Sequence, residues 1–518
     1  MLSLLLYSAA VLSLTAIGAA GDTWQVGQAV KTASGDVTGR PANYAGNEQV
    51  SEYLGIPYAA PPVGNLRWLA PQPYQANGTI AANKFGPYGL RLSKSCPQGN
   101  AASMNEDCLT LNIWTKPQTG ERSKAVLVSI YGGGFNAGSS NTRYLIGSPL
   151  ANKQDVVVVS MNYRLNVFGF PGAPGLKHQN LGMRDIRASV EWIRDNIAQF
   201  GGDPKRITLF GESAGGGATD YYSFAYDKDP IVNAFIPQSG SVWTRGIADD
   251  SNLDFWYKVA SKAGCGGAEA GEKTVECMRG KSWKEIMKQV PTGPRAPKLS
   301  FGPTYDEEII FKDYDARAKA GLFAKVPVFT GNTDNEGGFF KLLRPRMSKP
   351  DVQAMNLCFT CVALKSAKAR VDHKVPIWRY RFFGDFENNR HFAGEGAYHG
   401  SELPLVFGTP KAKEKINAPS TDTAVEAELT KTMMTAWAAF AKDPENGLLK
   451  LGYPQYDPKK ETLIKFGFQG GAGAVVGNVD EYDAECTKYE NSNDAIDVVM
   501  ARSGPVVDLP KGVGAAAE

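Results

Sequence analysis

The stretch Arg206-Ile207-Thr208-Leu209-Phe210 runs without a break into Gly211-Glu212-Ser213-Ala214-Gly215-Gly216. Its first half is rich in β-branched and apolar side chains, which is typical of a buried strand. A G-x-S-x-G sequence between a strand and a helix forms a nucleophile elbow, a sharp turn that strains the serine backbone and needs glycine where side chains would collide. The alternative is an incidental serine in a glycine-rich turn, but the preceding strand favours the elbow. We therefore expect Ser213 to be a nucleophile at the start of a helix.

A second glycine-rich segment lies upstream of this elbow. Residues 125–131 are expected to form a strand, and Gly132-Gly133-Gly134-Phe135 follows it directly. A serine nucleophile needs hydrogen-bond donors for the negative charge that develops on the substrate oxygen, and glycine lets backbone N–H groups turn toward a ligand. Alone, a glycine triplet also fits a flexible hairpin. Together with Ser213, it predicts an oxyanion hole formed by the N–H groups of Gly133, Gly134 and Ala214.

Short apolar strands alternate with helical periodicity along the chain. We expect strands at residues 125–131, 156–161, 206–210, 326–330 and 377–382. Between the second and the third strand, one apolar stripe recurs at helical spacing: Ile186, Val190, Ile193, Ile197 and Phe200. Another helix is predicted at residues 424–441. Such alternation is typical of βαβ units, and strands that are apolar throughout belong to a sheet covered on both faces.

Further motifs extend over most of the chain, from about Gly27 to Cys486. They are Gly55-Ile56-Pro57-Tyr58-Ala59, Asn105-Glu106-Asp107-Cys108-Leu109-Thr110-Leu111-Asn112, Tyr131-Gly132-Gly133-Gly134-Phe135, Asn162-Tyr163-Arg164, Phe200-Gly201-Gly202-Asp203-Pro204 and the elbow. Together they resemble the type-B carboxylesterase and lipase family, which includes cholinesterases, secreted fungal carboxylesterases and large yeast lipases. The resemblance implies an α/β-hydrolase fold, with a large mixed, mostly parallel sheet covered by helices on both faces. It also implies hydrolysis of carboxylic esters through an acyl-enzyme on Ser213, with no metal and no cofactor.

The same resemblance implies the acid and the base of a catalytic triad. Glu336, within Asn335-Glu336-Gly337, matches the acid of the family, and His399, within Tyr398-His399-Gly400-Ser401-Glu402, matches its histidine. The chain order Ser213, Glu336, His399 is the order of the triad in this fold. Asp334 competes with Glu336 for the role of the acid, and His391 is a more distant alternative to His399. The resemblance also implies two structural ion pairs, Arg67 with Glu106 and Arg164 with Asp185.

The seven cysteines fit an oxidising compartment. Two pairs are close in sequence, and each is expected to close a local loop: Cys96 with Cys108, and Cys265 with Cys277. An odd count leaves at least one thiol unpaired or pairing between chains. Among the remaining three, we expect a disulfide between Cys361 and Cys486, with Cys358 as a free thiol.

The N-terminus has the character of a secretory leader. Residues 1–21 contain no charged side chain, an apolar run covers residues 2–14, and small residues follow. This run is short for a membrane span, so the pattern predicts a signal peptide over residues 1–20 rather than an anchor or a buried helix. We expect an α/β-hydrolase domain over residues 21–505, a disordered tail over residues 506–518, and a secreted protein without stable membrane insertion. In an exported chain, the sequon Asn77-Gly78-Thr79 predicts glycosylation of Asn77.

The sequence leaves more than one function open. The formal net charge of +3 and the lack of a basic run argue against nucleic acid, while the oligomeric state stays undetermined. A carboxylesterase acting on a small-molecule ester is the leading hypothesis, and a triacylglycerol lipase or a non-catalytic adhesion module on the same fold are the alternatives. The predicted first disulfide loop, residues 97–107, has no aromatic residue to hold a quaternary ammonium group, which disfavours a cholinesterase. Met104 is its one large apolar side chain, so we expect dissolved short-chain esters rather than an oil surface as substrate.

Overall fold

The computed structural model describes residues 24–75, 78–83, 94–99, 104–291, 301–410, 422–492 and 498–499. The predicted signal peptide (residues 1–20), the sequon asparagine Asn77 and the predicted tail (residues 506–518) lie outside these residues. None of the described helices is both long enough and apolar enough to span a membrane.

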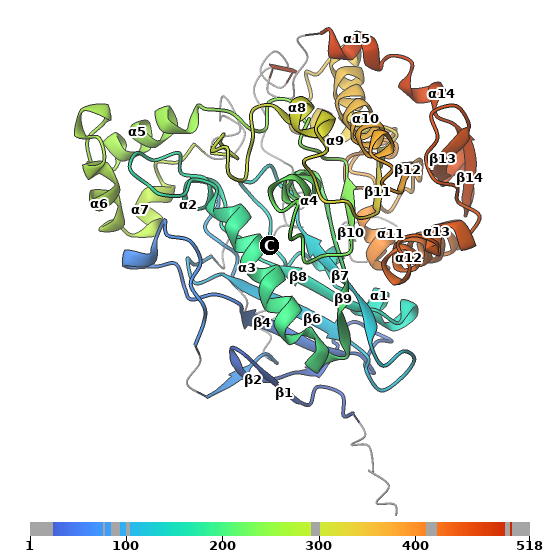
Figure 1. Ribbon diagram of the computed structural model, residues 1–518, viewed down its shortest axis with the longest axis horizontal. Coiled ribbons are helices and arrows are strands. Elements are labelled where there is room, and N and C mark those ends of the chain that lie inside the picture. Colours follow the sequence, from blue (N-terminus) through green and yellow to red (C-terminus); the bar gives the residue numbers. More distant parts are fainter. Residues whose placement is uncertain are drawn as a thin grey trace, which may run out of the picture.

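One sheet of 11 strands runs through the molecule (Figure 1). Its strands are β3 (Arg40–Pro41), β4 (Ser51–Pro57), β6 (Thr110–Thr115), β7 (Lys124–Ile130), β8 (Val157–Met161), β9 (Gly202–Glu212), β10 (Ala234–Gln238), β11 (Val328–Thr333), β12 (Ile377–Phe382), β13 (Glu461–Phe466) and β14 (Ala474–Asn478). In space they follow the order β14-β13-β12-β11-β10-β9-β7-β8-β6-β4-β3. Neighbours from β13 across to β8 are parallel, and the strands toward both edges are antiparallel. The predicted large mixed, mostly parallel sheet is confirmed.

A smaller sheet contains β1 (Ala29–Thr32), β2 (Gly35–Thr38) and β5 (Thr79–Ala81). All five strands expected from the sequence are present in the large sheet. β9 is longer than expected, because its polar first residues still pair with β7, at Gly202 opposite Lys124.

Helices cover both faces of the large sheet. They are α1 (Ser148–Gln154), α2 (Asn166–Gly169), α3 (Leu181–Asn196), α4 (Ala214–Ala225), α5 (Asn252–Lys262), α6 (Lys273–Arg279), α7 (Trp283–Met287), α8 (Tyr314–Lys319), α9 (Gly337–Leu343), α10 (Lys349–Asp372), α11 (Leu403–Phe407), α12 (Ala424–Lys442), α13 (Gly447–Lys450), α14 (Asp480–Asp483) and α15 (Cys486–Glu490). Successive residues of a strand point to opposite faces. Tyr380 of β12 packs its ring on Trp437 of α12, whereas Arg381, the next residue, hydrogen-bonds Thr360 of α10. α12 and α10 therefore lie on opposite faces.

The two longest helices begin at capping residues. Ser348 and Asp351 form a reciprocal capping box at the start of α10, and Thr423 accepts a hydrogen bond from the N–H of Glu426 at the start of α12. The predicted helix of the apolar stripe is α3, and the stripe continues into a short 3-10 turn that ends at Gly201, where φ is 80°. Both predicted helices are therefore confirmed, with local signals that explain where they start or stop.

α5, α6 and α7 form a group apart from the central sheet, at the left of Figure 1. Their apolar side chains pack in a second cluster that includes Trp68 and Trp256, whose rings meet edge to face at 4.9 Å. The disulfide between Cys265 and Cys277 joins the segment that follows α5 to α6. A local crosslink suits such a group, because a small cluster buries too little surface to be stable alone.

All three expected disulfides are present. Besides Cys265–Cys277, they are Cys96–Cys108 and Cys361–Cys486. Cys358 is buried and unpaired, and its burial raises the pKa of the thiol to about 12. The third disulfide joins α10 to α15 and so attaches α15 to the face of the sheet that α10 covers.

Both expected structural ion pairs are present and buried. The Nε atom of Arg67 lies 2.6 Å from Oε1 of Glu106. Arg164 and Asp185 make two side-chain contacts of 2.7 and 2.8 Å, and their side chains are 3% and 0% exposed. Asp185 also accepts a hydrogen bond from the backbone N–H of Arg164. This pair fixes the loop after β8 to the first turns of α3.

We predict that Asp185→Ala lowers the free energy of unfolding by about 3–5 kcal/mol, because it leaves the Arg164 guanidinium buried without a counter-charge. Urea denaturation followed by fluorescence measures the change. The matched control is Glu428→Ala, which breaks a pair with Lys431 whose side chains are 56% and 69% exposed, and which should change stability little. An equal loss in both variants would contradict the structural role of Asp185.

Candidate active site

Five neighbouring parallel strands end at one edge of the sheet. β7, β9, β10, β11 and β12 are adjacent in the spatial order and run in the same direction, so their carboxyl ends lie together. Open α/β sheets bind their ligands at this edge. The residues that follow these strands are Gly133 and Gly134 after β7, Ser213 after β9, Ser239 after β10, Glu336 after β11 and His399 after β12. The catalytic and oxyanion residues expected from the sequence are thus brought to one edge.

Ser213 lies at the tip of a sharp turn between β9 and α4. Its φ of 58° and ψ of −123° are unusual for a residue with a side chain, and such strain is typical of functional sites. Close packing enforces the turn. A Cβ on Gly215 would lie 2.1 Å from the carbonyl oxygen of Ile130 in β7, and one on Gly216 would lie 2.3 Å from that of Gln238 in β10. The backbone therefore has the elbow conformation that the sequence predicts.

The glycine loop after β7 lies against this elbow. A Cβ on Gly132 would be 2.9 Å from Cβ of Ser213. Gly133 and Gly134 have φ values of 113° and 62°. Within the described residues, no protein acceptor takes a hydrogen bond from the N–H groups of Gly133, Gly134 or Ala214. These amides can therefore donate to a negatively charged oxygen bound next to Ser213.

Glu336 and His399 form a buried hydrogen-bonded pair. Oε2 of Glu336 contacts Nδ1 of His399, and the two residues are 0% and 8% exposed. The other carboxylate oxygen of Glu336 accepts hydrogen bonds from Oγ of Ser239 and from the N–H of Thr333, both at 2.7 Å. One oxygen is thus held by protein donors while the other faces the imidazole. Such a carboxylate fixes the proton of the neutral imidazole on Nδ1 and leaves Nε2 as the base.

Glu212 occupies the opposite side of the imidazole. Its Oε1 atom lies 3.1 Å from Nε2 of His399. A Cβ placed on Gly132 would lie 3.2 Å from the other carboxylate oxygen of Glu212 and 2.9 Å from Cβ of Ser213. The serine, the Glu212 carboxylate and the glycine loop therefore lie next to one another. Within the described residues, the Ser213 hydroxyl makes no hydrogen bond to His399. Catalytic hydrogen bonds often tighten only in the complex with substrate.

Carboxylates dominate the electrostatics of His399. Burial alone would lower its pKa, but the charges of Glu212 and Glu336, the hydrogen bond that His399 donates to Glu336 and the charge of Glu402 together raise the pKa of His399 to about 9. Burial and the charges of Glu212 and Glu336 also raise the pKa of the Glu402 carboxyl to about 8. Glu402 accepts a hydrogen bond from Nε2 of Gln238 at 3.1 Å. The protonated imidazole of His399 is therefore more stable in this site than that of a histidine exposed to water.

Three phenylalanine rings line the imidazole. The ring centroids of Phe359, Phe340 and Phe339 lie 4.6, 5.2 and 6.1 Å from that of His399. Phe359 belongs to α10 and is buried, whereas Phe339 and Phe340 belong to α9 and are half-buried. Apolar rings keep water from the imidazole, which strengthens its interaction with the carboxylates.

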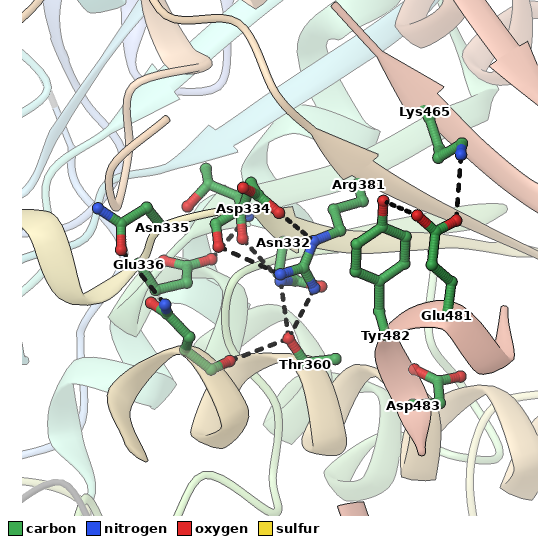
Figure 2. A network of polar contacts seen from close by, with 12 residues as sticks. Asn332, Asp334, Asn335, Glu336, Thr360, Arg381, Lys465, Glu481, Tyr482 and Asp483 are labelled. Atoms are coloured by element: carbon green, nitrogen blue, oxygen red, sulfur yellow. Dashed lines mark hydrogen bonds and ion pairs between the residues drawn. The ribbon is translucent and has the colours of Figure 1, made fainter. Parts of the chain in front are cut away.

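Asp334, the competing acid, takes no part in this group. Its carboxylate lies 2.9 Å from Nε of Arg381, and its side chain is 42% exposed. Figure 2 shows Asp334 directed to Arg381. The structure thus brings Glu336 to His399, and it places Asp334 in a different ion pair.

The other three histidines have partners elsewhere. Nδ1 of His391 lies 3.0 Å from Oε1 of Glu395, so Glu395 pairs with His391 and not with His399. His178 lies 3.6 Å from Glu308, and Nε2 of His373 contacts the carbonyl oxygen of Ala318 at 2.8 Å. In the part of the chain that the structure describes, no group of three or more His, Cys, Asp or Glu side chains is arranged to hold a metal ion.

Three residues of the site were not singled out as functional in the sequence: Glu212, Ser239 and Glu402. Glu212 is the variable position of the G-x-S-x-G motif, and its charge next to the nucleophile was the available signal. Glu402 follows His399 by three residues, again in a motif already recognised. Ser239 has no local signal, because its contact with Glu336 joins the segments after two strands, and the two residues are 97 positions apart in sequence.

Comparisons with known proteins agree with this geometry. The sequence model of the carboxylesterase family matches residues 27–356 and 351–479. A chlorogenic acid esterase from Aspergillus niger is 34% identical over 501 residues, which cover 89% of this chain and 95% of that protein. Secreted lipase 5 from Gibberella zeae is 34% identical over 80% of this chain and 86% of its own length, and a mouse cholinesterase is 29% identical over 80% and 78%.

Solved structures of PNB esterase superimpose on this fold. One has a TM-score of 0.72 and 26% identity, and the match covers 90% of this chain and 100% of that chain. A thermophilic PNB esterase has a TM-score of 0.73, with the same identity and coverage. The α/β-hydrolase fold and the elbow geometry are therefore accompanied by a family match over most of the chain. The chain belongs to the carboxylesterase family and is a hydrolase of carboxylic esters.

Proposed function

We propose that this protein is a secreted serine carboxylesterase in which Ser213, His399 and Glu336 form the catalytic triad. One observation carries the proposal: a strained serine, free amide donors and a buried carboxylate–imidazole pair converge where parallel strands end. Each element is needed for acyl transfer, because a serine hydroxyl is a weak nucleophile without a base and an oxyanion site. The site needs no metal or organic cofactor for this chemistry.

The mechanism follows from these positions. His399 takes the proton from Oγ of Ser213 through Nε2 while Oγ attacks the ester carbonyl carbon. The N–H groups of Gly133, Gly134 and Ala214 stabilise the oxyanion. The alcohol then leaves with the proton from His399, and an acyl-enzyme remains on Ser213. Water attacks this ester in turn with His399 as base, which releases the acid and restores the serine.

Glu336 and Glu212 have complementary roles in this proposal. Glu336 holds Nδ1 of His399 and stabilises the imidazolium that forms after proton transfer. Glu212 faces Nε2, the atom that exchanges the proton with Ser213. Its charge stabilises the same imidazolium, and it therefore raises the pH at which the base becomes neutral.

We infer that the substrate is an ester in solution. Met104, the large apolar residue of the first disulfide loop, is half-buried, and its sulfur accepts a hydrogen bond from the N–H of Gln98. Only part of its side chain is therefore available to a lipid surface. The chlorogenic acid esterase among the relatives is named for a small ester, which supports this class.

A lipase is the second candidate, and one observation favours it. α5 exposes 41% of Leu253 on a helix outside the central sheet, and a relative is named a secreted lipase. A helix of this kind could form an apolar lid. A single exposed leucine buries little area, however, and at about 25 cal/mol per Å² it anchors a protein weakly to an interface.

The disulfides and the fungal relatives support export of the mature protein. We propose that residues 1–20 are the signal peptide, that residues 21–505 form the hydrolase domain, with residues 506–518 as a disordered tail, and that Asn77 carries a glycan. Mass spectrometry of the secreted protein tests the new N-terminus and the glycan together.

We predict that Ser213→Ala lowers kcat by about 10⁶-fold, because the nucleophile is lost while the fold is kept. A fluorophosphonate probe should label the wild type at Ser213 and should not label the variant. Ser239→Ala is the control, since it removes another hydroxyl of the same site and should still be labelled. Activity or labelling that survives in Ser213→Ala would refute the assignment.

The pH dependence provides a second prediction. Because the pKa of His399 is raised and only the neutral imidazole acts as base, kcat/KM should fall as the pH drops through a value above the ordinary histidine pKa of about 6.5. Glu212→Gln removes a charge that raises this pKa, so the acid limb should move to lower pH. Glu428→Gln, an exposed change of equal charge, should leave the limb in place. A limb that is unmoved in Glu212→Gln would contradict the role of Glu212.

The substrate class is tested with a short-chain ester taken through its solubility limit. We expect the rate to saturate with dissolved ester and to show no rise when droplets form, because the first disulfide loop presents no apolar anchor. Emulsified long-chain triglyceride should be a poor substrate in the same assay. A sharp rise at the solubility limit, with triglyceride preferred, would establish the lipase instead.

A further inference from the structure

The proposed acid and base lie on different loops. Glu336 lies in the short loop between β11 and α9, and His399 lies in the long loop between β12 and α11. Their hydrogen bond requires the two loops to keep a fixed register. An error of about 1 Å in such a geometry can cost about 10²-fold in rate. The contacts that set this register therefore matter for the proposed function, on which this inference rests.

Asn335, the residue before Glu336, joins the two loops. Its backbone N–H donates to the carbonyl oxygen of Ala397 at 2.8 Å, and its backbone forms a bridge with Tyr398. Its side-chain Nδ2 donates to the carbonyl oxygen of Glu395 at 2.6 Å. In the described part of the chain, the other side-chain hydrogen bond between residues 333–337 and residues 394–400 is that of Glu336 with His399.

The acceptor of the Asn335 side chain is itself held firmly. Glu395 is buried, and its carboxylate accepts hydrogen bonds from the N–H and Nδ1 of His391 at 2.5 and 3.0 Å. Gly338 leaves room for the contact, because a Cβ there would lie 2.8 Å from the Glu395 carbonyl oxygen and 3.0 Å from Nδ2 of Asn335. The side-chain amide of Asn335 thus donates to a carbonyl oxygen that is held in place, and the space around this hydrogen bond is closely packed.

The amide is also oriented from the other side by α10. Oδ1 of Asn335 accepts a hydrogen bond from Nδ2 of Asn356 at 3.2 Å, and Oδ1 of Asn356 accepts one from the N–H of Gly337 at 2.7 Å. Asn356 therefore contacts the residues on both sides of Glu336. Since a carbonyl oxygen can only accept, the Asn335 amide must direct its NH₂ group to Glu395.

Asp334 anchors the same loop in a different direction. Arg381 contacts its carboxylate at 2.9 Å and its carbonyl oxygen at 3.1 Å, and Arg381 also donates to Oγ1 of Thr360 (Figure 2). These contacts join the loop to β12 and α10. None of them reaches the loop of His399, so Asp334 offers a matched control.

We propose that Asn335 is a positioning residue that holds Glu336 in register with His399 through its side-chain amide. It acts through Glu336 and touches neither the substrate nor the reacting atoms. Loss of the amide lets the two loops shift against each other and weakens the carboxylate–imidazole contact. The nucleophile and the glycine loop follow β9 and β7 and stay in place, so substrate binding is preserved.

The test compares Asn335→Ala and Asn335→Asp with Asp334→Asn and Glu336→Gln. The Asp variant has the same shape but cannot donate to Glu395. Both Asn335 variants should lower kcat by about 10²-fold with KM nearly unchanged, as expected when an interaction of the transition state is lost. The acid limb of Asn335→Ala should move to lower pH, because the Glu336 charge that raises the pKa of His399 is less well placed. Asp334→Asn should keep both kcat and the limb.

A double-mutant cycle separates positioning from general destabilisation. If Asn335 acts through Glu336, Asn335→Ala should lower kcat little further in the Glu336→Gln background. A full additional loss in that background, or an unchanged kcat in both Asn335 variants, would overturn the proposal. An equal loss in Asp334→Asn would do so as well. If Glu336→Gln itself retains activity, the proposed triad fails, which is a separate outcome from a failure of Asn335.

Discussion

The carbonyl oxygens of Ile130 and Gln238 crowd the turn after β9, and the arrangement of the site depends on this close approach. They come from the strands on either side, so the turn can pass between them only where residues 215 and 216 lack a side chain. The chain then has to bend sharply, and Ser213 adopts a positive φ. A strained residue of this kind costs about 1–3 kcal/mol, which the wide sheet on both sides of β9 has to offset.

The second constraint is electrostatic. Glu212, Glu336 and Glu402 are buried around a single imidazole, although burial of carboxylates is costly. Part of this cost is offset by hydrogen bonds that the carboxylates accept from Ser239, Thr333 and Gln238. A proton on Glu402 or His399 reduces the remaining net charge. The same carboxylates that destabilise the folded state when they are buried also stabilise the imidazolium form of His399. Stability and proton transfer thus depend on one set of residues.

Much of this organisation can be predicted from the sequence, because it rests on local patterns. Residues that are close together in the chain determine the elbow, the glycine loop and the alternating strands and helices. The structure contains each of these features. The choice between Asp334 and Glu336 could not be made from local pattern. They are two positions apart, and what distinguishes them is the partner that each meets, Arg381 or His399. The family resemblance supplied that choice. Glu212 was overlooked for the same reason, since its importance arises from a histidine that folds onto it from a distant loop.

The disulfide between Cys361 and Cys486 encloses a long part of the chain, with a sequence separation of 125, and His399 lies within that ring. The elbow serine and Glu336 lie outside it, on the N-terminal side. A protease that cut the backbone once within the ring would therefore leave the histidine-bearing fragment covalently attached to the rest. Such a nick separates the chain into two pieces only after the disulfide is reduced. The crosslink thus keeps the proposed base and nucleophile in one covalent molecule when the backbone between Cys361 and His399 is broken.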